Sequence, residues 1–445
     1  MADEGVRRQN PERRYLPEKA FNLVRSELES FCYRAEVRTY GVHLSTSHCC
    51  LYDRDGHYVD EGLGKGIGMQ SQVSAIFEAL EHYFGSAKYC VSAQTKARHV
   101  WSKVSQLPHV DILARDKAME LLLRHHSETE VPCRVFQSFD NRQRLLHPLV
   151  LTIQDYPHYQ LPGDTFNYTR ILRYSSGNGT AIGADFAEAA IHAINERVER
   201  DAESMFLIGT FLLRPPKLVR LVNPDSLPCE LRKLWDQINE LATDRLLIID
   251  ITTELGIPAF YAFFTQQKQM VQPRGCGCSL SKEYALERAL LEALQDFHIY
   301  QEFAEECDGD HATFLNALRG LPRYQDCARG DVALLIEKGL CETVDFGELI
   351  APRVPANVDA YLDRLLGKLA DSGFQAFYSV GYRSPRGLTC LNVLIPGLES
   401  FHLVKFGNAV LPGRRGCVLL HQHDASPSAE RAPPLSSNDV NGHGL

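Results

Sequence analysis

No apolar run in this 445-residue sequence approaches the roughly 18 residues that a membrane-spanning helix needs. The chain opens with MADEGVRRQNPERRY, which is charged and contains proline, so it does not resemble a secretory signal. The net charge of -9 argues against a nucleic-acid groove as the main surface. We therefore expect a cytoplasmic protein whose partners include neither membrane nor nucleic acid.

Familiar catalytic and metal-binding motifs are also missing. The sequence contains no HExxH motif and no Gly-x-Ser-x-Gly nucleophile elbow, which removes support for hydrolases of those types. It offers no pair of Glu-x-x-His motifs, as a dinuclear carboxylate-metal oxidoreductase would need. The 13 cysteines are an odd number, and the close pairs Cys49-Cys50 and Cys276-Gly277-Cys278 lack the spacer of a zinc knuckle. We expect reduced, mostly buried thiols.

The most informative segment that is present is an acidic stretch at residues 185–204. Its sequence, DFAEAAIHAINERVERDAES, contains neither proline nor glycine and predicts one long helix. At about 100° per residue, one side of this helix carries three carboxylates and an imidazole within roughly 80°: Glu188, His192, Glu196 and Glu199. Such a stripe needs a cation, which could come from solvent, from Arg200, or from Mg²⁺ that carries phosphates.

Besides a cation site, a second reading of this stripe is open. Ile191, Ile194 and Val198 lie on the opposite side of the helix, so the acidic side could simply face solvent. The acidic neighbours are expected to favour the protonated form of His192, which we interpret as a structural histidine bonded to a carboxylate.

Two further segments repeat the polar spacing of i, i+4 and i+7 inside aliphatic sequence. SQVSAIFEALEHYF carries Ser74, Glu78 and Glu81, and SKEYALERALLEALQDF carries Arg288, Glu292 and Gln295. Glutamate is rarely buried unless it is paired or binds a metal. Carboxylates that converge from three helices fit a nucleotide site with several cations.

Two glycine runs precede the first two of these helices. The run at residues 64–68, GKGIG, resembles a phosphate-cradling loop to which Lys65 adds charge, although it lacks the order of a Walker A motif. A flexible turn with a solvent lysine is the alternative. In the second run, at 175–180, Asn178 could orient a ligand, and the alternative is a plain type I′ turn at Asn178-Gly179.

The remaining sequence mixes helical and strand patterns. We expect a helix at 16–36, a hairpin at 39–58, a helix at 111–127, strands at 149–153 and 166–174, and a disordered tail from 423. Strands at both hairpin and crossover spacing, without a regular repeat, predict a mixed α/β or α+β fold.

Taken together, these segments resemble the YcaO superfamily of ATP-dependent enzymes that activate backbone amides. The matching blocks are GKG at 64–66, SAIFEALEHY at 74–83, GNGTAIG at 177–183, EAAIHAINERVERDA at 188–202, GCGCSLSKEYALERALLEALQ at 275–295 and VLIPGLE at 393–399. They occur in family order over roughly residues 38–420. Within the superfamily, the chain is most similar to the D subunit of microcin-type azole-forming synthetases.

The resemblance implies a YcaO-type fold with a Mg-ATP site between glutamate-bearing helices. It places this catalytic domain at 38–422, after an N-terminal helical segment at 1–37 and before the tail at 423–445. The implied Mg²⁺ ligands are Glu78, Glu81, Glu188, Glu196 and Glu199. The implied nucleotide contacts also include Lys65, Ser74, Asn178, Arg200, Arg288, Glu292 and Gln295. No residue is implied for proton transfer.

The implied activity is that of an ATP-dependent cyclodehydratase. Such an enzyme phosphorylates a backbone amide oxygen of a ribosomally made precursor peptide and converts Cys, Ser or Thr into thiazoline or oxazoline, as in azole-modified microcin biosynthesis. The alternatives are thioamide or macroamidine formation, and a degenerate family member that acts as a scaffold. The implied partners are the precursor peptide, a separate peptide-recognition subunit and a flavin (FMN) dehydrogenase, around a homodimeric core in a hetero-oligomer. In one departure from the family, His82 stands where the first block usually has arginine.

Overall fold

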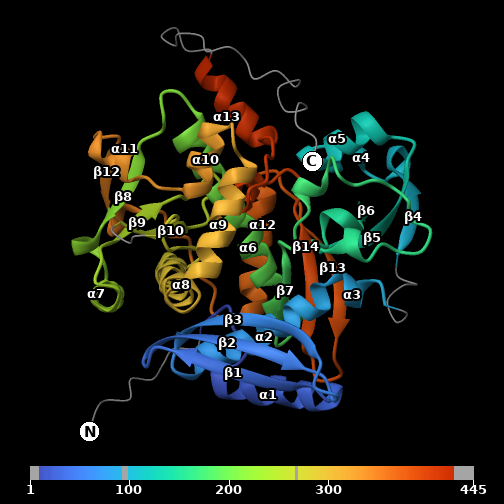
Figure 1. Cartoon of the computed structure of the whole chain (residues 1–445), viewed down its shortest axis with the longest axis horizontal. Coiled ribbons are helices and arrows are strands. Elements are labelled where there is room, and N and C mark those ends of the chain that lie inside the picture. Colours follow the sequence, from blue (N-terminus) through green and yellow to red (C-terminus); the bar gives the residue numbers. More distant parts are fainter. Residues whose placement is uncertain (1–9, 93–98, 266–268, 425–445) are drawn as a thin grey trace.

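The computed structural model describes residues 10–92, 99–265 and 269–424. Within these residues the strands form three sheets around a long helix, α6 (Phe186–Leu207). Figure 1 shows the three-stranded sheet below α6, the five-stranded sheet on the left and the six-stranded sheet on the right. No helix in the described part of the chain is both long and apolar enough to cross a bilayer.

The three-stranded sheet is an antiparallel meander of β1 (Arg34–Tyr40), β2 (Leu44–Tyr52) and β3 (Tyr58–Ile67). Two helices, α1 (Pro17–Phe31) and α2 (Met69–Gly85), bury their apolar sides against one of its faces. Part of the opposite face contacts the end of α8 (Lys282–Glu302), where the rings of His48 and Phe303 meet edge to face.

The six-stranded sheet joins segments from both halves of the chain. Its strands run in the order β4-β5-β13-β14-β7, with β6 beside β5. Their bounds are β4 (Val100–Lys103), β5 (Glu130–Ser138), β6 (Arg144–Pro148), β7 (Thr180–Gly183), β13 (Phe377–Arg383) and β14 (Thr389–Leu394). The short helices α3 (Ala87–Cys90), α4 (Val110–Leu113) and α5 (Lys117–His126) precede β5.

The five-stranded sheet has the order β11-β10-β9-β8-β12 and is antiparallel except for the parallel pair of β8 and β12. Its strands are β8 (Val219–Asn223), β9 (Leu246–Asp250), β10 (Ala259–Phe264), β11 (Arg274–Cys278) and β12 (Cys341–Asp345). Helices α7 (Cys229–Ala242) and α8 (Lys282–Glu302) share a hydrophobic core with it. The next helices are α9 (Ala304–Ala317), α10 (Pro322–Arg329) and α11 (Ala333–Glu337).

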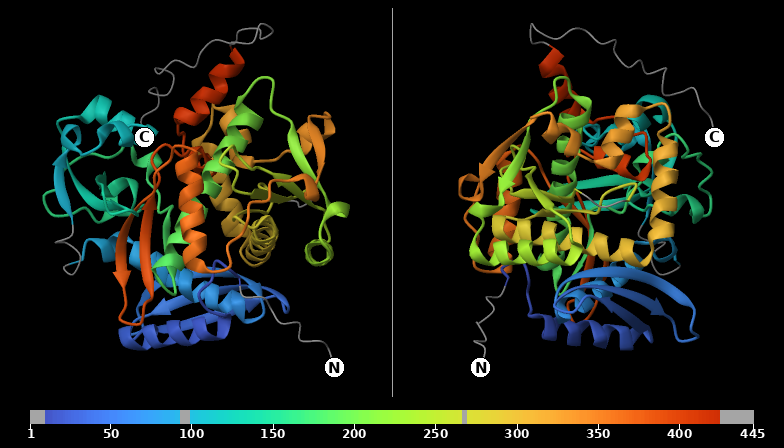
Figure 2. Two further views of the ribbon diagram at one scale, coloured as in Figure 1. Left: turned by 180° about the vertical axis from the view of Figure 1, so that it is seen from behind. Right: turned by 60° about the vertical axis from the view of Figure 1, so that its left-hand side comes forward.

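Helix α6 lies between the sheets and ends in a π turn at Ile208–Leu212. Figure 2 shows from behind that α12 (Val358–Asp371) runs alongside α6, in agreement with their close packing. A 3₁₀ segment at Phe401–Phe406 and α13 (Arg414–Asp424) complete the described chain. The central helix is therefore in contact with elements from the middle and the end of the sequence.

Strand glycines let three helices approach their sheets at backbone distance. A Cβ atom on Gly64 of β3 would lie 1.9 Å from the carbonyl oxygen of Ser71 in α2, and one on Gly277 of β11 would lie 2.1 Å from that of Ala285 in α8. Gly183 of β7 has the same relation to α6. A side chain at these positions would push each helix away from its strand.

Several expectations from the sequence are wrong. The helix expected at 16–36 ends at Phe31, and the one expected at 111–127 is divided into α4 and α5. Residues 149–153 and 166–174 do not form strands; they contain 3₁₀ turns at Leu149–Leu151 and Leu172–Tyr174. The run at 64–68 is neither a phosphate loop nor a flexible turn, because most of it is the end of β3 packed on α2. Residues 425–445 of the expected disordered tail lie outside the described residues, while 423 and 424 end α13.

Candidate functional site

The acidic side of α6 faces the protein rather than solvent. Asp185 caps the helix by accepting the N–H of Glu188 at 2.9 Å. Glu188 is only 5% exposed and Glu199 only 2% exposed. The solvated-face reading is therefore wrong, and buried carboxylates of this kind need partners.

Side chains of α2, β3 and α8 lie close to this side of α6. Lys65 of β3 donates to Glu292 of α8 in an ion pair. Glu81 of α2 accepts the backbone N–H of Ile182 at 2.8 Å, next to the start of α6. The Oε1 atom of Glu78 is 3.9 Å from Nε2 of His82; burial raises the pKa of Glu78, and the charges of His82 and Lys65 oppose that rise. The following residues form what we call the glutamate cluster: Lys65, Glu78, Glu81, Glu188, Glu196, Glu199, Arg200, Arg288 and Glu292.

At the centre of the glutamate cluster, Glu199 lies between two arginines. Its Oε1 atom is 3.5 Å from Nη1 of Arg200, and its Oε2 atom is 3.8 Å from Nη2 of Arg288. Oε2 of Glu199 and Nε of Arg288 are both buried without a hydrogen-bond partner among the described residues. Such orphaned atoms are rare in folded proteins and indicate a place where a bound group completes the bonding.

The N-terminal segment contributes an arginine whose place here could not be predicted from sequence spacing. Arg13 donates to Oε1 of Glu188 at 3.2 Å, and the backbone N–H of Arg14 donates to Oε2 of Glu188 at 2.8 Å. Glu12, 5% exposed, accepts hydrogen bonds from Ser279, Tyr361 and Asn195. Residues 10–16 thus form a strap, anchored by Glu12, that lies against the start of α6.

Burial and mutual repulsion raise the pKa of several of these carboxylates and so disfavour their charged form. Burial, followed by the charges of Glu196 and Glu78, raises the pKa of Glu81 well above its usual value. Burial also raises the pKa of Glu196 and of Glu199, although Arg200 opposes the shift at both. For Glu292, Lys65 and Arg200 outweigh burial and lower the pKa. A divalent cation would relieve the repulsion that remains.

The expectation for His192 is wrong. Burial lowers its pKa well below the usual value, and Arg288, Arg13 and Lys65 lower it further. The imidazole is therefore neutral, because burial disfavours its charged form and the nearby cations repel an added proton. Among the described residues, no carboxylate bonds to its ring.

Three of the expected contacts lie apart from the cluster or make no contact in it. Within the described chain, Ser74 and Gln295 are half-buried and show no side-chain hydrogen bond or ion pair. The amide nitrogen of Asn178 is 2.6 Å from Nε2 of His402. Asn178 also lines a small cavity of about 60 Å³ with Arg197 and His147. These three residues stay predictions as nucleotide contacts.

Sequence reasoning also missed the residues that support Arg200. Arg200 lies 3.4 Å from Glu203, whose side chain is fully buried, and Lys405 donates to the same carboxylate. Burial opposes ionisation of Glu203, but Lys405 and Arg200 hold its pKa at about 2. Glu203 continues the acidic spacing of α6 by four residues from Glu199, which is a signal that could have found it.

The chemistry of the cluster fits magnesium and a triphosphate. Mg²⁺ prefers carboxylate oxygens, and Glu78, Glu81, Glu196 and Glu199 supply them from two helices. Lys65, Arg200 and Arg288 are the side chains best suited to phosphate oxygens, since lysine and arginine carry permanent positive charge. The unpartnered oxygen of Glu199 is the observation that favours a bound cation over a closed set of ion pairs.

Comparison with known proteins identifies the family. The family described as YcaO cyclodehydratase, ATP- and Mg²⁺-binding, matches residues 63–399. This chain belongs to the YcaO family, and the expected cofactors, ATP and Mg²⁺, are confirmed at that level.

Solved structures confirm the expected fold class. A heterocyclase in complex with substrate and cofactor has a TM-score of 0.61 at 17% identity, covering 88% of this chain and 54% of its own. YcaO from Methanopyrus kandleri, bound with AMPPCP and Mg²⁺, has a TM-score of 0.60 at 16% identity, covering 87% and 92%. A chain of the E. coli microcin synthetase McbBCD complex has a TM-score of 0.57 at 11% identity, covering 82% and 88%. These likenesses show the fold.

One curated relative is similar in sequence. It is an uncharacterized protein in the tfuA 3′ region of Rhizobium leguminosarum bv. trifolii, 27% identical over 248 residues. The match covers 50% of this chain and about half of the relative, 52% of its length.

Proposed function

We propose that this protein is an ATP-dependent cyclodehydratase that activates a backbone amide of a ribosomally made precursor peptide. A Cys, Ser or Thr side chain attacks the preceding amide carbonyl, and phosphorylation of the amide oxygen turns it into a leaving group. Departure of phosphate, with loss of the amide N–H proton, leaves a thiazoline or oxazoline. Membership of the YcaO family supports the reaction class.

The observation that carries the proposal is the convergence of glutamates from α2 and α6 on Lys65, Arg200 and Arg288. Glu199 is buried, and Glu78, Glu81 and Glu196 are half-buried. ATP supplies the phosphoryl group, and Mg²⁺ neutralises the charge of the triphosphate. The residues of the chain bind and orient: Glu78, Glu81, Glu196 and Glu199 would hold Mg²⁺. Arg200, held by its ion pair with Glu203, would face phosphate oxygens from a fixed position.

Glu188 differs from the other proposed metal ligands because both of its oxygens are engaged. Arg13 and the N–H of Arg14 occupy them. We propose that Glu188 remains part of the site through Arg13, whose guanidinium it directs into the cluster. The Arg13 side chain is partly open, at 32% exposure.

The partners are part of the proposal. Peptide-binding machinery comes from a separate recognition subunit, and aromatic azoles require a flavin (FMN) dehydrogenase to oxidise the azoline. The McbBCD microcin synthetase, a fold relative, is itself a complex. A homodimeric core in a hetero-oligomer and a cytoplasmic location complete the proposal.

A second candidate is thioamide or macroamidine formation, in which an external sulfur or an amine replaces the side-chain nucleophile. The glutamate cluster favours it equally, because the cluster binds ATP and does not touch the nucleophile. A degenerate scaffold is disfavoured, since the predicted glutamates of α2 and α6 are present and lie close to Lys65, Arg200 and Arg288.

The test is a reconstitution with mass spectrometry. The chain, a Cys- and Ser-containing peptide and a recognition protein encoded by neighbouring reading frames are incubated with Mg²⁺ and ATP. A cyclodehydratase removes one water per modified residue and releases one ADP. Exchange of oxygen for sulfur supports the thioamide alternative, and ATP turnover without any change of peptide mass contradicts both. Glu240→Gln, an exposed change on α7, is the matched control for Glu199→Gln, which should lose the activity.

A further inference from the structure

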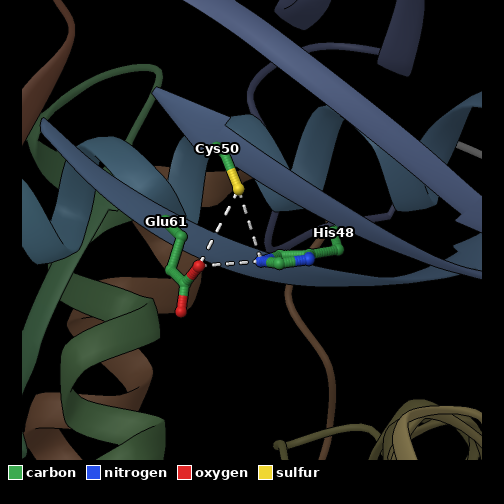
Figure 3. Close-up of side chains that lie close together, drawn as sticks. All are labelled: His48, Cys50 and Glu61. Atoms are coloured by element: carbon green, nitrogen blue, oxygen red, sulfur yellow. Dashed lines mark hydrogen bonds and ion pairs between the residues drawn. The ribbon is translucent and has the colours of Figure 1, made fainter. Parts of the chain in front are cut away.

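A second group of chemically active side chains lies on the face of the three-stranded sheet that contacts the end of α8. His48 and Cys50 are two residues apart on β2, so their side chains point to the same side. Glu61 of β3 is the register partner of Cys50. Figure 3 shows the three side chains turned toward one another across the two strands. We call them the β2–β3 triad.

The ligand atoms of the triad form a compact triangle. Nε2 of His48 is 3.0 Å from Oε2 of Glu61, and Sγ of Cys50 is 3.7 Å from that nitrogen and 3.8 Å from that oxygen. Tetrahedral Zn²⁺ has bonds of about 2.3 Å to sulfur and about 2.0–2.2 Å to nitrogen and oxygen, which separates its ligand atoms by roughly 3.3–3.6 Å. The observed sides bracket that range, so shifts of a few tenths of an ångström suffice.

The positions of the triad are fixed by secondary structure. Cys50 pairs with Glu61 and His48 with Leu63 in continuous antiparallel register. The His48 ring is also held edge to face by Phe303, at 6.3 Å between ring centroids. The His48 side chain is 21% exposed and that of Glu61 51% exposed, so an ion from solvent can reach them. A site on paired strands loses little side-chain freedom on binding.

We propose that His48, Cys50 and Glu61 bind a divalent transition-metal ion of the zinc class, with a fourth position open to water. Thiolate, imidazole and carboxylate are together the ligand set that Zn²⁺ prefers, and Mg²⁺ does not use sulfur. On binding, the ion would displace the thiol proton of Cys50, which leaves to solvent.

The triad is separate from the glutamate cluster in place and in chemistry. Glu61 precedes Lys65 by four residues on β3, which is roughly 13 Å along a strand. The cluster offers carboxylate oxygens to its cations and the triad offers sulfur and nitrogen. An excess of Mg²⁺ therefore fills the first site without competing for the second.

A neighbouring acidic group provides a contrast. Asp53, Asp55 and His57 also lie close together, in the β2–β3 turn. There the Asp53 carboxylate already accepts the N–H groups of Asp55 and His57, which explains the arrangement as a turn. The hydrogen bonds of the turn account for this group without a metal ion, so its His57 is a suitable control residue.

The test is titration of the full chain with Co²⁺ in excess Mg²⁺, followed by displacement with Zn²⁺. We expect one equivalent of Co²⁺ to give the near-ultraviolet charge-transfer band of a thiolate ligand. Cys50→Ser should abolish the band and weaken Zn²⁺ binding more than about 100-fold, beyond what loss of an outer-shell partner costs. His48→Ala should weaken Zn²⁺ binding to a similar extent.

Two matched controls separate the triad from adventitious binding. Cys32→Ser removes an exposed thiol at the end of α1, and His57→Ala removes the histidine of the turn; both should leave the band unchanged. Circular dichroism checks that each variant is folded. An equal band in Cys50→Ser, or no binding of Zn²⁺ below millimolar concentration by the unmodified chain, would overturn the proposal.

Discussion

At the scale of single residues, the glutamate cluster is organised by its cations. Arg200 lies between Glu199 and Glu203, and Arg288 approaches Glu199 from α8. Removing one member of a buried ion pair leaves the other charge unpaired, which costs about 3–5 kcal/mol. Substitutions that keep shape and hydrogen bonding, such as Glu to Gln, therefore test function with less damage to folding than truncation to alanine.

His147 gives a pH dependence that is independent of the cluster's acids. It is 3% exposed, and burial followed by Arg197 lowers its pKa to about 3. As pH falls below about 6.5, the unfolded chain binds a proton that the folded chain refuses, so stability is lost through this range. We predict that His147→Gln removes about 1.4 kcal/mol per pH unit from the slope of the unfolding free energy between about pH 6 and pH 4.

Urea unfolding of both proteins at several pH values measures this difference. Above about pH 7 the two curves should run parallel, since His147 is then neutral in both states. Equal slopes for the two proteins below pH 6 would show that the folded protein accepts the proton at His147.

Residue positions were predictable where spacing carries the information. The helical spacing of Glu188, Glu196 and Glu199 predicted a shared face, because side chains on one helix obey a fixed period. Arg13 and Lys405 were not predictable, since each reaches the cluster through tertiary contacts from a distant part of the chain. The protonation of His192 was predicted wrongly for the same reason: only its helix neighbours were visible.

At the scale of elements, the strap at residues 10–16 brings a cation into a site built by other segments. Glu12 and Arg14 hold the strap on both sides of Arg13. Burial and the charges of Glu196 and Glu78 raise the pKa of Glu81, and the charge of Arg13 opposes this rise, so the guanidinium acts beyond its direct partner Glu188.

We predict that Arg13→Ala raises the KM for ATP about tenfold with little change in kcat, because the loss of one cation near the carboxylates weakens attraction of a triphosphate. Arg13→Lys should restore part of the affinity, since it keeps the charge but not the planar fork. Steady-state ATP hydrolysis measures both constants. An unchanged or lower KM in Arg13→Ala would mean that the strap does not support nucleotide binding.

Gly277 tests the close packing of β11 on α8. Alanine there would place its Cβ 2.1 Å from the carbonyl oxygen of Ala285, and backbone cannot yield as a flexible side chain does. We predict that Gly277→Ala lowers the unfolding free energy by more than about 3 kcal/mol. Gly309→Ala in α9, where no atom lies within 4 Å of the new Cβ, should instead stabilise by about 0.5–1 kcal/mol. Similar unfolding midpoints for the two variants would contradict this packing role.

Element prediction succeeded for long periodic segments and failed for short apolar ones. The helix at 185–204 appears close to its expected bounds, and the turn expected at 53–56 does join two strands, although that hairpin runs from Leu44 to Ile67 and not over 39–58. Leu149–Leu151 is apolar enough for a buried strand, but it follows Pro148 and turns inside the core. At 166–174, where a strand was expected and none forms, the Asn167 side chain accepts the N–H of Thr169, which competes with strand pairing.

At the scale of the whole molecule, the account depends on helices α2, α6 and α8 meeting although they are far apart in sequence. The strand glycines of β3, β7 and β11 allow that meeting, and Figure 1 shows α6 between the sheets that carry the other two helices. Sequence spacing predicted which face each helix would present but not the distances between them, because those depend on packing of the entire core.

The most direct test of the central claim is calorimetric titration of the full chain with AMPPCP, with and without Mg²⁺, for the unmodified protein and for Glu199→Gln. If the buried glutamates bind the triphosphate through magnesium, one AMPPCP should bind per chain only when Mg²⁺ is present, and Glu199→Gln should weaken that binding at least about tenfold, or about 1.4 kcal/mol. Equal affinity with and without Mg²⁺, or in Glu199→Gln, would contradict the account.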